Sequence, residues 1–266
     1  MPAPPILYHY TTEEGLLGII KSRCLWTTNI FYLNDSTEFN YALELARAVL
    51  KEKLSGPAAR NEQKQFYEDA LGTLDDLAPI VPEALSLHVG SFSTNDDSLS
   101  QWRAYTENGI GFSLGFDEAY LQSLAKRQKY ELVECEYDEI GHKRAISVLI
   151  DESAESTDRK LDLFHELLRR SPRLKHPKFK DEKEWRIVSE DMGHGKPKFR
   201  AGKSMLIPYS EFKLEGEDGI LRIAEIRVGP TPHPQLAVAS VMQLINDADK
   251  RAPAKVRISD VPYRSW

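Results

Sequence analysis

Cysteine is scarce in this chain, and long apolar runs are absent. The 266 residues include two cysteines, Cys24 and Cys135, too few for a disulfide scaffold or a cysteine-rich zinc site. We expect both to be reduced core thiols of a cytoplasmic protein. No stretch approaches the ~18 apolar residues of a membrane span, and the first five residues lack the features of a signal peptide. A membrane partner is therefore not expected.

Positive charge is not in excess. The chain has 35 Lys and Arg against 41 Asp and Glu, a formal net charge of −6. This balance excludes the broad cationic surface of non-specific nucleic-acid binders, but it does not exclude a local basic groove. Hydrophobic residues make up 41% and charged residues 29%, a composition typical of a soluble globular protein.

The familiar motifs of nucleotide and hydrolase sites are also missing. The sequence has no GxxxxGK loop, no GxGxxG after a strand, no HExxH and no GxSxG. The seven histidines do not fall at metal-ligand spacings. We therefore expect no metal in the site.

Strand and helix patterns recur without strict alternation. Apolar or alternating stretches predict strands at 6–10, 25–28, 84–93, 110–116, 132–137, 184–188, 205–209, 220–228 and 255–259. Helical spacing predicts helices after a Thr11-x-x-Glu14 capping box with a stripe reaching Cys24, and at 39–50, 66–74, 138–170 and 234–246. These patterns predict an α+β fold with mostly antiparallel sheets and helices packed on them. We expect one domain over 1–266, with 138–178 a helical insertion.

Two polar clusters lie early in strand-like surroundings. In the first, Tyr8–Thr11, alternation places His9 on the opposite face from Tyr8 and Tyr10; a satisfied core or surface histidine is the alternative. The second joins Ser91-Phe92-Ser93 to 101–105. Turn caps and core packing of Trp102 and Tyr105 would explain it equally.

The third cluster is Lys180–Val188. Strand periodicity puts Glu182, Glu184 and Arg186 on one face. Two like charges there would raise each other's tendency to bind protons, which functional sites exploit. An exposed edge strand guarded by charges is the competing explanation. The preceding basic stretch 169–178 is expected to be a solvated loop, or else a guide for an anionic partner.

These clusters, in this order, resemble the bacterial family called domain of unknown function 2971. The shared features are Leu7–Thr11, Leu25-Trp26, Asn34-Asp35-Ser36-x-Glu38, Ser91-Phe92-Ser93, Trp102-x-x-Tyr105, Gly109-x-Gly111-x-x-x-Gly115-Phe116, Glu182-x-Glu184-Trp185-Arg186 and Pro262-Tyr263-Arg264. They extend over almost the whole chain, but the family name supplies no chemistry.

A looser resemblance, to ADP-ribosyltransferases, supplies a chemistry. His9, Ser91-Phe92-Ser93 and Glu182-x-Glu184 resemble, in order, the histidine strand, the serine strand and the late acidic pair of those enzymes. The combination mixes two classes of these enzymes. His9 is similar to the histidine class, whereas Ser91-Phe92-Ser93 is similar to the serine motif of the arginine class. Phe92, Tyr105 and Tyr32 are candidates for stacking on nicotinamide.

The resemblance implies an ADP-ribosyltransferase-like core and NAD as substrate. The implied catalytic residues are Glu184, Glu182 and His9. Glu184 would stabilise the oxocarbenium-like centre, Glu182 would polarise the acceptor, and His9 would anchor a ribose hydroxyl or phosphate. Ser91 or Ser93 would orient Glu184. The implied NAD-binding residues are His9, Tyr10, Thr11, Ser91, Phe92, Ser93, Arg103, Tyr105 and Arg186. The acceptor would be a protein or a nucleic acid, and a toxin or anti-phage defence role, with an antitoxin or inhibitor partner, is expected by analogy.

Two other hypotheses for the function are not excluded by the sequence. One is a non-catalytic module that binds a nucleotide or a partner on the same scaffold. The other is a metal-free nuclease that uses His9 with His88 or His176, which would have to lie within hydrogen-bond reach.

Overall fold

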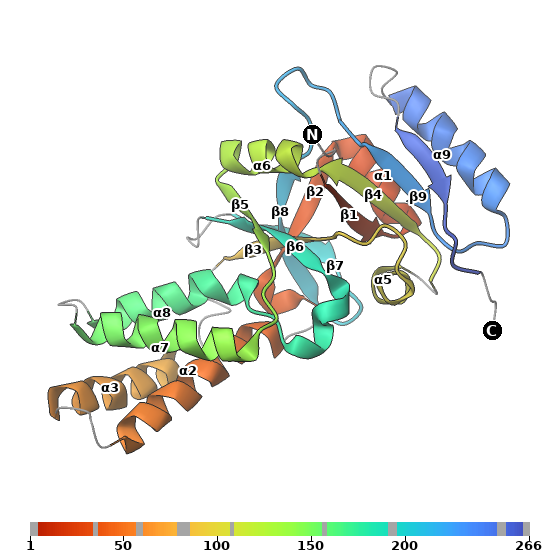
Figure 1. Cartoon of the computed structure of the whole chain (residues 1–266). Coiled ribbons are helices and arrows are strands. Elements are labelled where there is room, and N and C mark those ends of the chain that lie inside the picture. Colours follow the sequence, from red (N-terminus) through yellow and green to blue (C-terminus); the bar gives the residue numbers. More distant parts are fainter. Residues whose placement is uncertain are drawn as a thin grey trace.

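A ten-stranded mixed sheet forms the centre of the molecule (Figure 1). The structure, a computed structural model, describes residues 5–33, 37–56, 61–78, 86–106, 109–155, 159–190, 196–248 and 254–262. The strands are β1 (Ile6–Thr11), β2 (Cys24–Asn29), β3 (His88–Ser93), β4 (Phe112–Asp117), β5 (Tyr130–Glu134), β6 (Glu184–Ser189), β7 (Lys198–Ala201), β8 (Leu206–Lys213), β9 (Glu225–Val228) and β10 (Lys255–Ile258).

Strand β3 is the branch point of this sheet. One of its edges pairs with β6 along Val89–Ser93, whereas the other pairs with β2 at its start and with β1 at Ser93. The β1 wing continues through β4 and β9 to β10, and the β2 wing continues through β8 to β7. Only the β9–β10 pairing is parallel among the described strands. The predicted α+β fold with a mostly antiparallel sheet is confirmed, and the ADP-ribosyltransferase-like core stays a prediction.

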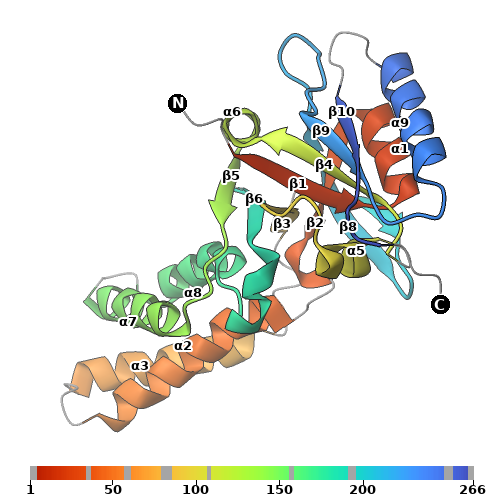
Figure 2. The ribbon, with the colours of Figure 1, turned by 45° about the vertical axis from the view of Figure 1, so that its right-hand side comes forward.

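Three helices cover one face of the β1 wing (Figure 2). They are α1 (Glu13–Ser22), α6 (Glu118–Arg127) and α9 (Pro234–Ala248). Their apolar stripes pack with Leu7, Phe92 and Leu114 in one buried cluster. This face of the sheet is therefore the hydrophobic core, and the opposite face is free to carry polar side chains.

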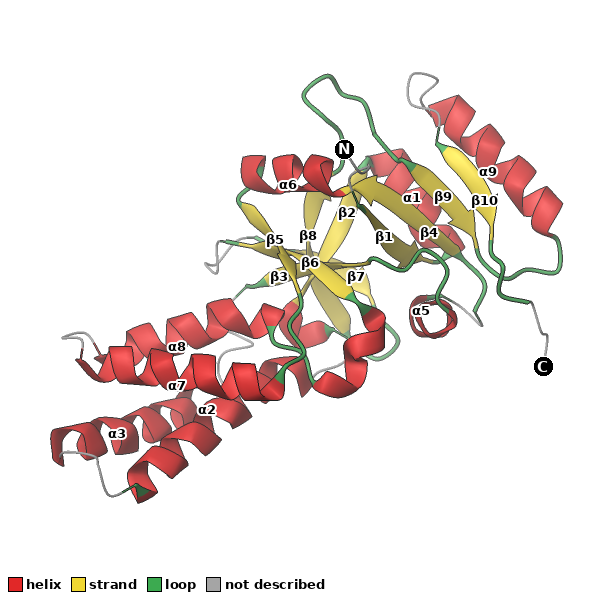
Figure 3. Ribbon diagram, viewed as in Figure 1, coloured by secondary structure: helices red, strands yellow, loops and turns green. Residues whose placement is uncertain are grey.

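A separate helical unit projects from the sheet (Figure 3). It consists of α2 (Thr37–Ser55), α3 (Asn61–Leu77), α7 (Glu139–Glu155) and α8 (Arg159–Arg170), which share a second buried cluster. The predicted insertion at 138–178 supplies α7 and α8. The other two helices come from the connection between β2 and β3, so the unit is assembled from two separate parts of the chain.

Some local predictions are wrong at the start of the chain. Helix α1 is capped by Thr12, whose hydroxyl accepts from the Gly15 N–H at 3.2 Å. Thr11 is unavailable as a cap because it still pairs with Phe112 in the β1–β4 ladder. Arg23, in the left-handed conformation at φ 56°, ends the helix, so Cys24 begins β2 instead of closing the helical stripe.

Two expectations for the third cluster, Lys180–Val188, and the basic stretch before it are also wrong. Strand β6 pairs on both sides, with β3 and β5, so it is not an edge strand. The basic stretch 169–178 contains the end of α8, the 3₁₀ turn Ser171–Arg173 and the start of the 3₁₀ turn Pro177–Glu182. Its Lys175 is buried. The sequence patterns did not predict α5 (Leu99–Tyr105), α6 or β7. The predicted turn at 34–36 lies outside the described residues.

Candidate active site

One face of the sheet carries a continuous polar row. Directly opposed residues of neighbouring strands share a face, and the register links Tyr8 to Ser93, Ser93 to Glu184, and Tyr8 through Gly115 to Glu225. The polar members of the row are Tyr8, Tyr10, Ser91, Ser93, Ser113, Glu184, Arg186, Glu225 and Arg227. They project away from the hydrophobic core described above.

Glu184 is the most strongly bound carboxylate of this row. Its two oxygens accept from Arg186 Nε at 2.8 Å and Arg186 Nη2 at 2.9 Å, and one also accepts from Lys175 Nζ. All three side chains are at most 4% exposed. Burial alone would raise the pKa of Glu184, but Arg186 and Lys175 outweigh it and lower the pKa to about 2. The expected mutual raising of carboxyl pKa values is therefore wrong for Glu184, because two cations surround it.

Glu182 is the more accessible of the two acids. It ends the 3₁₀ turn, its carboxylate pairs with Lys175 Nζ, and its side chain is 19% exposed. The Ser93 hydroxyl donates to the backbone carbonyl of Glu182 at 2.7 Å and accepts from the Asn95 N–H. Ser93 thus fixes the Glu182 backbone. The expectation that Ser91 or Ser93 orients the Glu184 carboxylate is therefore wrong for Ser93.

Tyr105 faces the same acids from helix α5 (Leu99–Tyr105). Burial, followed by the charges of Glu184 and Glu182, raises the pKa of its hydroxyl. Its ring is half-buried, whereas Arg103 on the same helix is exposed. Of the aromatic candidates for stacking, Phe92 is excluded because it lies in the core against Phe116.

His9 does not join this group. Its register partner is Leu114, a core residue, and its ring contacts Phe92 at 5.8 Å between centroids. Its Nδ1 lies 2.9 Å from the Ser91 carbonyl, which makes Nδ1 the protonated nitrogen. Burial lowers the pKa of His9, partly opposed by this hydrogen bond. The resemblance to ADP-ribosyltransferases implies one site that contains both His9 and the two acids. This expectation is wrong, because His9 projects from the opposite face of the sheet.

The remaining predicted ligands on β1 are already occupied. The Tyr10 hydroxyl donates to the Asn95 carbonyl and accepts from the Ser98 N–H, and its ring packs on Trp102. Thr11 is buried at the end of β1 beside Gly15. Both hold structure together, and neither contacts Glu182 or Glu184 among the described contacts.

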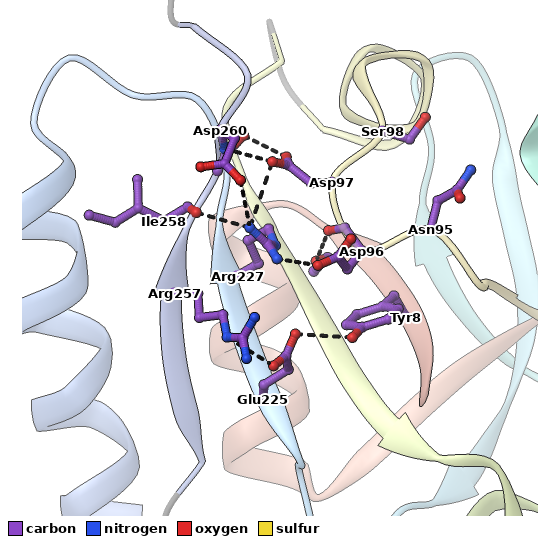
Figure 4. A network of polar contacts seen from close by, with 12 residues as sticks. Tyr8, Asn95, Asp96, Asp97, Ser98, Glu225, Arg227, Arg257, Ile258 and Asp260 are labelled. Atoms are coloured by element: carbon purple, nitrogen blue, oxygen red, sulfur yellow. Dashed lines mark hydrogen bonds and ion pairs between the residues drawn. The ribbon is translucent and has the colours of Figure 1, made fainter. Parts of the chain in front are cut away.

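A second ionic network, at the far end of the polar row, was missed by sequence reasoning (Figure 4). Arg227 on β9 binds Asp96 and Asp97, and it donates to the Ile258 carbonyl at 3.0 Å. Next to it, Glu225 accepts from the Tyr8 hydroxyl at 3.0 Å and pairs with Arg257. The sequence did contain a pattern that could have indicated this network, because Glu225-x-Arg227 repeats the Glu184-x-Arg186 pattern on another strand.

Asp97 connects this network to α5. Its carboxylate accepts from Trp102 Nε1 at 2.8 Å, from the Ser259 hydroxyl and from the Asp260 N–H. Trp102 is fully buried between Tyr10 and the backbone near Gly229. Asp97 thereby holds α5, and with it Tyr105, in place over the polar row.

A shallow cavity of about 660 Å³ lies elsewhere, between α6 and the 216–222 segment. Most of its charged lining is internally paired, since Arg222 binds Asp218 and Arg127 lies 3.8 Å from Glu217. It contains none of the residues of the polar row, and concavity without unpaired chemistry is weak evidence for a site.

The described part of the chain also bears on the expectations for metal ligands, cysteines, membrane-spanning helices and histidine pairs. Within it, no group of three His, Cys, Asp or Glu residues could hold a metal ion. Both cysteines are free and buried, as predicted. None of the helices described there is long and apolar enough to cross a bilayer. His176 contacts Tyr41 and Phe179. The histidine pair that the nuclease hypothesis requires, His9 with His88 or His176, is not found among the described contacts.

Comparisons with known proteins agree with the family resemblance. Residues 101–187 match the model of the family described as "Protein of unknown function (DUF2971)". The matched segment extends from α5 into β6 and includes Tyr105, Glu182, Glu184 and Arg186. The resemblance to this family is thereby confirmed. Neither the curated proteins nor the solved structures gave a match.

Proposed function

We propose that the protein is an NAD-dependent ADP-ribosyltransferase whose reaction takes place at Glu182. The observation that carries the proposal is the meeting of three sequence-distant parts on one face: the serine strand β3, the acidic pair at the start of β6, and Tyr105 of α5. Cleavage of the bond between nicotinamide and ribose forms an oxocarbenium-like centre, which a fixed carboxylate stabilises.

The structure divides the roles of the two acids differently from the sequence motif. Glu182 is the carboxylate with solvent access, so it is the one that would reach the ribose. Glu184 would act as a positioning residue, because it holds Lys175 and Arg186 in place from a fully buried position. Tyr105 would stack on the nicotinamide ring, and His9 would support β3 from the core side through the Ser91 carbonyl.

The acceptor would approach over the 3₁₀ turn. Lys178, Lys180 and Lys183 are exposed on either side of Glu182, and exposed cations attract anionic surfaces of proteins or nucleic acids. A cytoplasmic toxin or defence role, with an inhibitor partner, extends the proposal by analogy alone.

Release of labelled nicotinamide from NAD by the purified protein tests this function. We expect Glu182→Gln to lower the rate by ~10²–10⁴, the usual loss for one well-placed catalytic group. Glu134→Gln, at an exposed position on β5, is the matched control and should leave the rate unchanged. Equal rates for wild type and folded Glu182→Gln would contradict the proposal.

A non-catalytic binding module is the second candidate, and one observation favours it. The charges of Glu184, Arg186 and Lys175 are buried and mutually paired, as in a structural network. A thermal shift with NAD but no nicotinamide release in the presence of lysate acceptors would establish this reading instead.

A further inference from the structure

Strand β7 leaves one edge of the sheet open. It stands at one end of the strand order and, in the described part of the chain, pairs with β8 alone. The hairpin it forms with β8 is exposed, with Phe199 60%, Met205 57% and Leu206 66% accessible to solvent. A free edge offers backbone donors and acceptors to another extended chain.

The register shows which backbone groups are free. The Gly202 N–H donates to the Met205 carbonyl at 2.9 Å, which makes 202 and 205 the hydrogen-bonded pair that closes the turn. Hydrogen-bonded and non-bonded pairs alternate in an antiparallel ladder, so Arg200 and Ile207 are the next bonded pair. The N–H and C=O groups of Phe199 and Ala201 therefore point away from β8.

The two faces of the hairpin differ in character. Phe199 pairs with Pro208, and Ala201 pairs with Leu206, so exposed apolar side chains share one face. Lys198 and Arg200 alternate with them on the other face.

This segment is locally basic. Residues 196–206 contain Lys196, Lys198, Arg200 and Lys203 and no acidic residue, in a chain of net charge −6. Lys198 pairs with Glu211, whereas Arg200 donates to the Thr28 hydroxyl. Among the described residues, none of Lys196, Arg200 and Lys203 has an acidic partner.

We propose that the β7 edge binds an extended segment of another protein by strand addition, and that this segment alternates apolar and acidic residues. Its backbone would pair with Phe199 and Ala201, and its apolar side chains would cover Phe199 and Leu206. Its carboxylates would meet the exposed Lys196 and Lys203. A second copy of β7 fits less well, because the cations of the two strands would face each other.

Binding of a fluorescein-labelled ten-residue peptide of alternating valine and glutamate tests the proposal by anisotropy. We expect saturable binding that weakens with salt, and no binding of the same peptide with lysine in place of glutamate. Ala201→Pro removes one outward N–H and leaves the bonds to β8 intact, which edge strands tolerate. It should weaken binding about tenfold, the effect of one or two lost hydrogen bonds.

Variants that change the charge of the segment provide a second test in the same binding experiment. Lys196→Glu with Lys203→Glu should weaken binding, whereas Lys51→Glu, on the exposed face of α2, should not. Unchanged affinity of both Ala201→Pro and the double charge variant would overturn the proposal. It would also be overturned if single-stranded RNA or anionic lipid vesicles bound through Lys196 and Lys203 while the acidic peptide did not. None of these outcomes depends on NAD chemistry.

Discussion

Lys175 is the residue on which the buried charges of the site depend. Its ammonium pairs with both Glu182 and Glu184, so its removal leaves Glu184 with Arg186 and takes this buried cation from Glu182. We expect Lys175→Met to lower the free energy of unfolding by about 3–5 kcal/mol, the cost of breaking a buried ion pair from one side. Urea unfolding measures this loss.

A control separates this effect from ordinary ion-pair loss. Lys53 pairs with the half-exposed Asp151 on the helical unit, and Lys53→Met should cost less than about 1 kcal/mol. A loss for Lys175→Met no larger than that for Lys53→Met would show that the Lys175 network stabilises the fold no more than this partly exposed ion pair does.

His9 should make stability depend on pH. Burial lowers its folded pKa below the ordinary 6.5, so the unfolded chain binds a proton more readily. The stabilisation is complete above about pH 6.5 and is lost as pH falls from there towards the folded pKa. His9→Gln should therefore reduce the decline in unfolding free energy between pH 7 and 5, and the exposed His165→Gln should not. Parallel pH curves for wild type and His9→Gln would contradict this expectation.

The placement of His9 also shows what the sequence could and could not predict about the site. Alternation within β1 correctly separated His9 from Tyr8 and Tyr10, and alternation within β6 correctly joined Glu184 to Arg186. The relation between strands was not accessible, because the register that opposes Tyr8 to Ser93 is set by tertiary pairing. His9 and the acids were therefore grouped by order along the chain, although they occupy opposite faces. Lys175 was missed because a lysine in a basic stretch has no local sign of burial.

At the scale of elements, the position of α5 depends on Asp97. Three donors and Arg227 converge on its carboxylate, from α5, from β9 and from the segment after β10. Asp97→Ala should release α5 from the sheet and cost about 2–4 kcal/mol, since several partners are left unsatisfied. Hydrogen exchange at 99–105 should accelerate at least tenfold, while exchange in α9 stays unchanged. Uniform acceleration throughout the protein would show only a global loss of stability.

The helices and strands that the sequence patterns did not predict are short or directly joined to their neighbours. Helix α6 follows β4 without a loop, because Asp117 is both the last strand residue and the cap that accepts from the Tyr120 N–H. The alternating pattern of β4 therefore leads into the helix with no turn signal. Strand β7 has four residues, too few to establish a period of two. The longer helices α2, α3, α7 and α8 were predicted because their apolar stripes repeat over several turns.

At the scale of the whole molecule, the two hydrophobic clusters should respond separately to mutation. Leu50 lies in the cluster of the helical unit and Leu114 in that of the sheet, and both are fully buried. We expect Leu50→Ala to cost 2–5 kcal/mol and to raise hydrogen exchange mainly in α2, α3, α7 and α8. Leu114→Ala should do so mainly in the sheet. Identical exchange patterns for both variants would show that the chain unfolds as one cooperative unit.

The branching of β3 constrains how the protein can be made. Its three partners come from residues 6–11, 24–29 and 184–189, so β3 cannot be completed until the ribosome has released β6. A chain arrested before that point would present an open strand beside incomplete ion pairs, a state inclined to aggregate. The sheet can therefore be completed only after residues 184–189 have been synthesised, and nascent chains should need chaperone protection until then.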